Sequence, residues 1–460
     1  MMGRILGIEL RRSAAVGAAL LSLVVSAAAL LSFPQGFAGR WMQLAVAVRL
    51  MLMLSWPLAL AGGAWLGRRD ARSRVDELFA STARPRWQRV LPTAAALAVT
   101  LVAGYALTFL VAAAWVIPAA GYFPVTAIAV TAVGALSVVA AGWLGMAVGR
   151  AVPRLVTPPA LAVAGVALAG LLPDWLSAAA FAGDPAKVEP AALLLTPVYL
   201  GELHDFQTVV ARVNLTQALW LAALAATGLL LFGAVGRRAV ALAVLPAVLG
   251  AAVAVPLMPT GGYDAAAAVD PDAVELVCDD DGPQVCVTRV HAGLLPDLVG
   301  PARQALTMMA AKLPDAPVRA VESQQVTLPA WPVPAPPRPE ADTLVFPGPP
   351  IGRTGRADVS SEPVLPSLLK AAWQQDCADG SGDSIEAYLA RAVAAAWLTG
   401  QPPAPEDWWE SGERRRVERA YQALVGLPQD EQRRRMAAAR EAVLDCRSDA
   451  LLPILPRDAL

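Results

Sequence analysis

Histidines and cysteines are the residues of this 460-residue chain with the widest chemical range, and there are few of them: two histidines and four cysteines. His204 and His291 belong to no HExxH motif, and the chain has neither a GxSxG motif nor a GxxxxGK[ST] phosphate-binding loop. His291 opens an expected helix over residues 291–313, where we assign it a capping or surface role. The cysteines lack the CxxC spacing of a zinc site. We therefore expect no catalytic residue, no metal and no cofactor in this chain, and no enzymatic activity.

The four cysteines all lie in the C-terminal part of the chain: Cys278, Cys286, Cys377 and Cys446. Cys278 and Cys286 flank a turn sequence at 279–283 between two valine-rich runs, so we expect them to pair across a hairpin. Cys377 and Cys446 would then form a second disulfide, although four cysteines allow three pairings. An even number of cysteines confined to one region is typical of an oxidising compartment. The alternative is four free thiols in a cytoplasmic domain.

Composition indicates a membrane protein, because 56% of the residues are hydrophobic and only 16% are charged, against about 25% charged in a soluble domain. A bilayer-spanning helix needs roughly 20 apolar residues. Seven segments meet this requirement: 14–33, 45–66, 91–117, 123–149, 157–181, 214–234 and 239–258. They lack the alternation of barrel strands, so we expect helices. The predicted fold is an α-helical polytopic membrane protein with a C-terminal extracytoplasmic α+β domain.

A cluster of helix breakers at 256–262 marks the predicted boundary between the spans and this domain, 259–460. The domain's predicted strands are 273–278, 284–290, 317–328 and 342–346. Its predicted helices are 291–313, 364–375, 384–398, 412–425 and 429–445.

Arginine placement predicts the orientation of the spans, because cytoplasmic connections are rich in positive charge. Arginines crowd the N-terminus, the second connection (residues 67–90), the fourth connection (150–157) and the sixth connection (Arg237 and Arg238), whereas the odd-numbered connections have few. We expect a multi-pass cell-membrane protein with its N-terminus in the cytoplasm and residues 259–460 outside. The net charge of −1 and the preference for arginine over lysine give no sign of a nucleic-acid partner, and we expect none.

Two ionisable residues fall within the predicted spans, Arg49 and Asp174. An ionisable residue inside a membrane is a functional candidate by default. Both lie near the expected outer interface, where a long side chain can extend toward water. We therefore expect interfacial positions and no ion pathway.

The second connection, residues 67–90, contains a short amphipathic helix at about 70–81. Val75, Leu78 and Phe79 share one face of this helix, with charged residues around them. A loop that only satisfies the positive-inside rule needs arginines, but neither the acidic pair Asp76 and Glu77 nor an apolar face. This pattern therefore needs an explanation beyond the positive-inside rule.

This loop resembles the first coupling helix of ABC-2-type (type V exporter-like) transporter permeases, a cytoplasmic helix that docks on a separate ATPase subunit. Glu77, Leu78, Ser81, Thr82 and Arg86 fill the motif of that family. The resemblance implies a set of ATPase-coupling residues: Arg72, Arg74, Val75, Asp76, Glu77, Leu78, Phe79, Arg84 and Arg86.

Other segments resemble parts of the same family. Residues 1–13 resemble its amphipathic cytoplasmic N-terminal helix, and 150–157 its second coupling element. Residues 190–200 resemble its re-entrant outer helices. The resemblance covers a six-span core at 14–235, whereas a seventh span (239–258) and the outer domain depart from the pattern.

The resemblance implies a permease subunit of an ABC exporter. Its partners would be an ABC ATPase subunit that holds ATP and Mg, a second permease subunit in a homodimer or heterodimer, and membrane lipid. The apolar spans favour a hydrophobic or amphipathic cargo. The alternative is a membrane-anchored extracytoplasmic binding or sensing protein without transport activity.

Overall fold

The structure is a computed structural model of the chain. It describes residues 14–69, 87–171, 175, 196, 203–259, 264–325, 340, 342–357, 364–374, 385–403 and 411–447. The chain divides into two compact units. The helical unit comprises Met1–Pro118 and Phe123–Asp270, and the C-terminal unit comprises Ala119–Tyr122 and Pro271–Leu460. Each unit is described by itself below.

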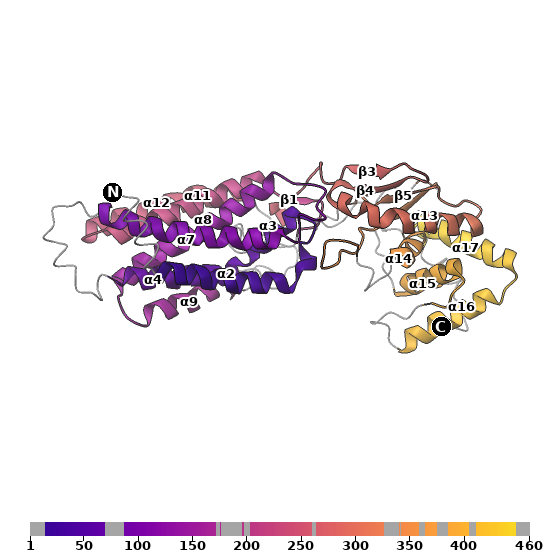
Figure 1. Ribbon diagram of the computed structural model, residues 1–460, viewed down its shortest axis with the longest axis horizontal. Coiled ribbons are helices and arrows are strands. Elements are labelled where there is room, and N and C mark those ends of the chain that lie inside the picture. The colour runs from indigo at the N-terminus through magenta and orange to yellow at the C-terminus, as the bar shows by residue number, and fades with distance from the viewer. Residues whose placement is uncertain are drawn as a thin grey trace. The chain divides into compact units, whose positions relative to one another are not determined.

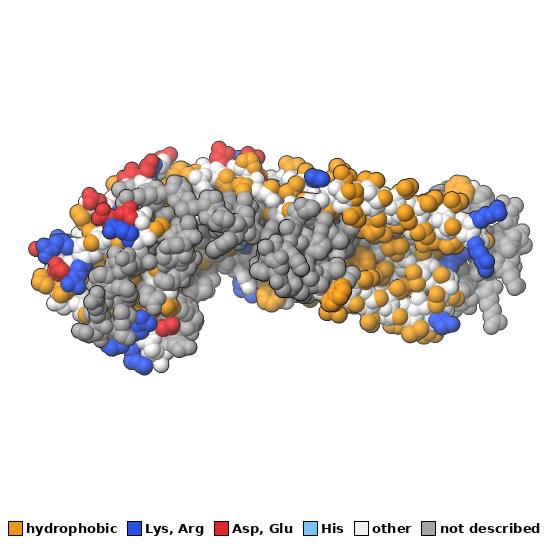
Figure 2. All heavy atoms as spheres, turned by 180° about the vertical axis from the view of Figure 1, so that it is seen from behind, with side chains coloured by type: hydrophobic (Ala, Val, Ile, Leu, Met, Phe, Trp, Pro, Cys, Tyr) orange, Lys and Arg blue, Asp and Glu red, His pale blue; other side chains and the backbone are white. Residues whose placement is uncertain are grey.

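The helical unit is a bundle (Figure 1). Its elements are α2 (Ala14–Ser32), η1 (Pro34–Gly36), α3 (Trp41–Leu50), α4 (Leu52–Gly67), α7 (Trp87–Ala113), α8 (Thr126–Ala151), α9 (Thr157–Val166), η2 (Ala167–Leu171), α11 (Ala211–Gly233) and α12 (Arg237–Leu257). Hydrophobic side chains cover most of the visible face of this unit (Figure 2). A lipid-facing surface has this composition, because hydrocarbon does not solvate polar side chains.

Four helices of the described residues are long and apolar enough to cross a membrane: Val90–Ala113, Thr126–Ala151, Ala211–Gly233 and Arg237–Leu257. A fifth span is possible if α3 and α4 count together, since they are bent by 45° at their break. Ala19–Ser32 and Thr157–Leu171 are apolar but shorter. Each of the seven predicted spans overlaps an apolar helix of the described residues, but only four of these helices reach spanning length by themselves, so the number of spans stays a prediction.

Helices α4 and α8 pack backbone against backbone through glycines. A Cβ atom at Gly63 would overlap the backbone oxygen of Gly142, and one at Gly145 would overlap that of Leu60. Gly67 and Gly149, four residues further along each helix, make equally close approaches. Small residues at this spacing let helices meet closely in lipid, where packing drives association in place of the hydrophobic effect.

A two-stranded sheet completes the helical unit. Strand β1 (Gln207–Val209) pairs antiparallel with β2 (Ala267–Val269), which follows the short helix η4 (Asp264–Ala266). Because β2 is paired with β1, the chain stays with the helical unit as far as Asp270. The domain boundary predicted at residue 259 lies before this strand.

The C-terminal unit contains a four-stranded sheet of order β3-β4-β5-β6. Strands β3 (Leu276–Asp279) and β4 (Val285–Thr288) form an antiparallel hairpin, whereas β4, β5 (Arg319–Glu322) and β6 (Thr343–Phe346) are parallel. The helical elements are η5 (Arg289–Leu294), α13 (Leu295–Lys312), α14 (Val364–Ala371), α15 (Ile385–Thr399), α16 (Ser411–Val425) and α17 (Gln429–Leu444). The predicted mixture of helices and a small sheet is confirmed, and each predicted strand and helix of this domain overlaps an observed one. Helix α13 connects β4 to its parallel neighbour β5, as parallel strands require.

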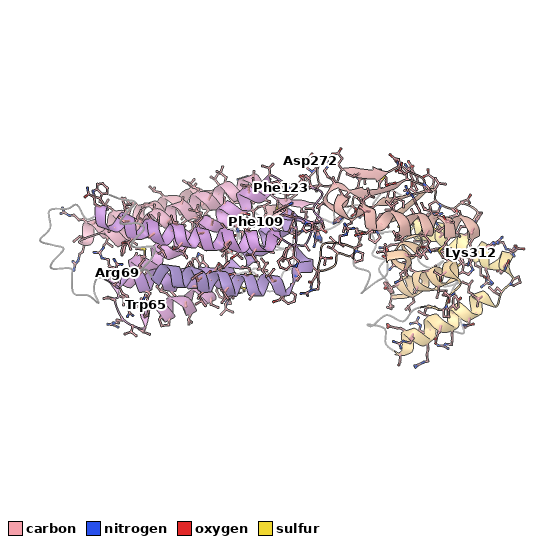
Figure 3. All side chains as sticks on the ribbon, in the orientation of Figure 1. Trp65, Arg69, Phe109, Phe123, Asp272 and Lys312 are labelled. Atoms are coloured by element: carbon pink, nitrogen blue, oxygen red, sulfur yellow. A yellow bond between two sulfur atoms is a disulfide. The ribbon has the colours of Figure 1, made fainter. Side chains whose placement is uncertain are left out.

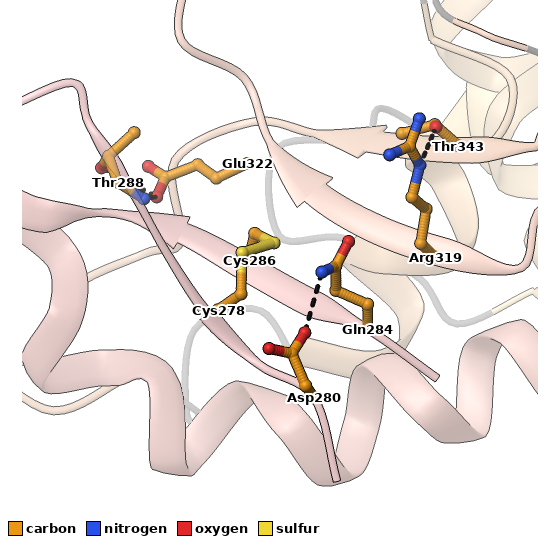
Figure 4. The surroundings of a disulfide bond; sticks show 8 residues. All are labelled: Cys278, Asp280, Gln284, Cys286, Thr288, Arg319, Glu322 and Thr343. Atoms are coloured by element: carbon orange, nitrogen blue, oxygen red, sulfur yellow. Dashed lines mark hydrogen bonds between the residues drawn. A yellow bond between two sulfur atoms is a disulfide. The ribbon is translucent and has the colours of Figure 1, made fainter. Parts of the chain in front are cut away.

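The hairpin carries the predicted disulfide. Cys278 and Cys286 are directly opposite one another in β3 and β4 and are bonded through their sulfurs (Figure 4). Cys446 is also disulfide-bonded, whereas Cys377 lies outside the described residues. The Cys278–Cys286 pairing is therefore confirmed, and the pairing of Cys377 stays a prediction.

Replacing Gly145 by alanine tests the close packing of α4 and α8. Since the added methyl group overlaps the Leu60 backbone, we expect Gly145→Ala to destabilise the helical unit by about 1–3 kcal/mol. The readout is the apparent melting temperature of the full chain in detergent.

Gly233→Ala is the matched control. Gly233 ends helix α11, and a Cβ atom there would have no neighbour within 4 Å. This variant should leave the melting temperature unchanged or raise it slightly. Equal melting temperatures for the two variants would contradict the close approach at Gly145.

Candidate functional site

The predicted ATPase-coupling residues, from Arg72 to Arg86, lie outside the described residues. So do Asp174 and the segments 1–13 and 190–200 that carried part of the resemblance. The structure does describe both flanks of the coupling loop, at the end of α4 and the start of α7. The site is therefore built from these flanks and from the helices behind them.

Arg68 follows the last residue of α4 and connects two predicted cytoplasmic connections. Its Nη1 donates to the backbone oxygen of Arg154, 3.2 Å away, in the connection between α8 and α9. Its guanidinium also lies 4.6 Å from the ring centroid of Trp65, a favourable cation–π distance. Only 5% of Arg68 is exposed, so this contact fixes the spacing between the two helix ends.

Arg150, in the last turn of α8, connects α8 to a third helix, α11, at the same end of the unit. Its guanidinium donates to the backbone oxygen of Phe232 in α11 and lies 6.0 Å from the ring of that residue. Figure 3 shows Trp65 and Arg69 at this end of the bundle, with Phe109 and Phe123 toward the other end. The ends of α4, α8 and α11 thus meet in an arginine-rich cluster.

The opposite end of the bundle is held by aromatic rings and by one ion pair. Trp41 stacks on Phe109 at 6.2 Å and meets Phe123 edge-on at 5.3 Å. Arg40 pairs with Asp205 at 2.5 Å, in the segment that leads into β1. Tryptophan is common at membrane interfaces because its ring is apolar and its N–H is polar.

Arg49 lies inside the bundle, and the expectation that its side chain extends toward water is wrong. Its exposed fraction is 0%, and its Nη2 donates to Oε1 of Gln217 at 2.6 Å. Gln217, on α11, is itself buried. The side chain does not extend toward water because α11 supplies a buried acceptor for it.

Further polar side chains lie buried in the same bundle. Ser26, Ser55 and Tyr105 line a cavity of about 10 Å³, and their hydroxyls have no hydrogen-bond partner within the described part of the chain. A cavity of this size accommodates about one water molecule. Asn214, one turn before Gln217 on α11, is buried as well. Polar groups within apolar helices are costly unless they find partners inside the bundle.

A second buried polar cluster lies in the C-terminal unit and contains His291. The expected surface or capping role of this residue is wrong. His291 Nδ1 lies 2.5 Å from Glu322 Oε1, and both side chains are buried. The backbone N–H and the hydroxyl of Thr288 donate to Glu322 Oε2 at 2.8 and 2.9 Å (Figure 4). These bonds join the carboxyl ends of the parallel strands β4 and β5.

No three His, Cys, Asp or Glu side chains come together as a metal site in the part of the chain that the structure describes. Comparisons of this chain with protein-family models, curated proteins and solved structures find no match. Function must therefore be argued from the geometry of the two units.

Gln217→Leu tests the buried contact in the helical unit. It removes the acceptor of Arg49 while the guanidinium stays buried, so we expect a loss of about 1–3 kcal/mol of stability. Thermal unfolding of the full chain in detergent measures it. Gln217→Glu keeps an oxygen acceptor and should retain the wild-type melting temperature. An unchanged melting temperature for Gln217→Leu would show that Arg49 does not depend on this contact.

Glu322→Gln tests the cluster in the C-terminal unit. An amide cannot accept from both Thr288 and His291 as the carboxylate does, so we expect a loss of about 1–3 kcal/mol. Glu340→Gln, which removes an exposed partner of Arg319, should cost less than about 1 kcal/mol. Pulse proteolysis with trypsin, read from the C-terminal fragments, compares the variants. Equal protection would mean that Glu322 contributes no more than a surface charge.

Proposed function

We propose that this chain is the membrane-spanning permease subunit of an exporter that is driven by a separate ATPase docking on residues 67–90. ATP and Mg would be held by that ATPase, and a second permease subunit would complete the transport path. The cargo would be hydrophobic or amphipathic, in keeping with the apolar helices of the unit. The N-terminus and the coupling loop would be cytoplasmic and the C-terminal unit extracytoplasmic.

The observation that carries this proposal is the contact between Arg68 and Arg154. It joins the start of the connection after α4 to the middle of the connection after α8, the two connections that resemble coupling elements. Behind this contact, the two helices are in backbone contact through their glycines. A force applied to the loop after α4 would therefore reach α8 directly, because closely packed helices move together and deform little.

Two further observations agree with the proposed orientation. Arg68, Arg150 and Arg154 gather at one end of the bundle, as the positive-inside rule expects of a cytoplasmic end. The disulfide between Cys278 and Cys286 suits an extracytoplasmic location for the C-terminal unit, since disulfides persist in oxidising compartments.

Co-purification tests the proposal. The full chain, tagged and extracted from its native membrane in a mild detergent, should capture a nucleotide-binding ATPase subunit that mass spectrometry identifies. Glu77→Ala and Phe79→Ala should abolish this capture, because they remove the acidic and apolar parts of the docking helix. Asp281→Ala, in an exposed turn of the C-terminal unit, is the control and should capture as much ATPase as the wild type.

Absence of an ATPase from the wild-type capture would contradict the proposal. The chain would then be better explained as a membrane-anchored extracytoplasmic binding or sensing protein. Capture that survives both loop substitutions would instead place the ATPase dock elsewhere on the chain.

A further inference from the structure

The C-terminal unit has a groove that the proposed transport function does not use. It lies between the end of α13 and the first three turns of α17 and has a volume of about 560 Å³. Its apolar lining comes from Ala310, Ala311, Leu313, Pro314 and Ala437. A volume of this size falls within the range of about 300–1,000 Å³ typical of small-molecule sites.

Three cations line this groove, Lys312, Arg433 and Arg434, against one carboxylate, Asp430. Lys312 is placed by Trp397: its Nζ donates to the backbone oxygen of Trp397 and lies 5.1 Å from the ring centroid (Figure 3 labels Lys312). Partial burial, and then the nearby Arg433 guanidinium, lower the pKa of Lys312 below its usual value. Two like charges are thus held close together at one groove.

Arg433 differs from its neighbours along α17. Glu431 accepts from both Arg434 and Arg435, at 2.8 Å each. These hydrogen bonds, that of Arg435 first, lower the pKa of Glu431. Arg433, by contrast, makes no ion pair with any residue that the structure describes. Its charge is available to a bound molecule.

Hydrogen bonds fix the groove between its two walls. The Nε1 of buried Trp397 donates to Gln432 Oε1 at 2.9 Å, which connects α15 to α17. Gln432 Nε2 in turn donates to the backbone oxygen of Leu427 at 2.8 Å. Because Lys312 also donates to Trp397, both walls of the groove are connected to this residue. A ligand would therefore find a largely preformed site.

We propose that this groove binds a molecule that carries a phosphate group on an apolar body. Lys312 and Arg433 would hold the phosphate, since two cations match a phosphate monoester of charge about −2. The alanine and leucine lining would cover the apolar part. Free phosphate is much smaller than the groove and would leave this lining empty. The site is independent of whether the chain transports anything.

Calorimetric titration of the full chain in nanodiscs of zwitterionic lipid tests the proposal with three soluble probes. Hexyl phosphate should bind, inorganic phosphate should bind at least several-fold more weakly, and 1-hexanol should not bind measurably. Equal affinity for hexyl phosphate and inorganic phosphate would overturn the apolar part of the site. No binding of hexyl phosphate would overturn the site altogether.

Arg433→Gln and Arg435→Gln form the matched pair. Both remove one exposed guanidinium from the same helix, but only Arg433 lines the groove. Arg433→Gln should weaken hexyl phosphate binding roughly tenfold, whereas Arg435→Gln should leave it within about twofold. Equal losses would indicate a general effect of net charge and would overturn the assignment. Lys312→Gln provides a second variant on the opposite wall, with an expected loss like that of Arg433→Gln.

Discussion

The close packing of α4 on α8 is the constraint on which the rest of the helical unit depends. Their glycines bring the two backbones into contact, and neighbouring helices use the same device. Gly228 of α11 approaches the α8 backbone at Trp143 and Leu144, and Gly165 of α9 approaches Pro57 of α4. Since apolar side chains gain little by leaving lipid for protein, backbone proximity supplies the packing that holds such helices together. The close approaches of these glycines thus form a seam that involves four helices.

This seam also explains where the polar residues lie. Arg49 precedes the 45° bend between α3 and α4, so it lies outside the glycine contact and faces Gln217 of α11. The α4–α8 contact is therefore made by backbone atoms and glycines, while Ser55 and Tyr105 line a cavity beside Met51 at the bend. In the proposed exporter, a force at Arg68 would move α4 and α8 as one body. The break at Met51 would be the nearest place where the chain can change direction.

The sequence predicted those features that depend on neighbouring residues. Apolar runs predict helices because lipid leaves the backbone no other partner, and the Cys278–Cys286 pair follows from a local hairpin. The two polar clusters were missed for a different reason: hydropathy does not tell which face of a helix meets a neighbour. Asn214 and Gln217, one turn apart in an apolar run, were the available signal for the partner of Arg49. Glu322 contacts His291 only because β4 and β5 are parallel neighbours, which no local pattern indicates. The coupling residues of the 67–90 loop stay a prediction, since they lie outside the described residues.

The positive charges at the groove of the C-terminal unit outnumber the negative ones, and this excess is relevant to the kind of ligand that the groove would bind. Lys312 ends α13, where the helix dipole stabilises a cation, whereas the N-terminal turn of α17, where the dipole favours anions, ends before Arg433. Asp430 and Glu431 suit that position, and Glu431 is engaged by two other arginines. Arg433 makes no ion pair among the described residues, and its guanidinium contributes to the lowered pKa of Lys312. An anion bound between Lys312 and Arg433 would offset the repulsion between these two cations.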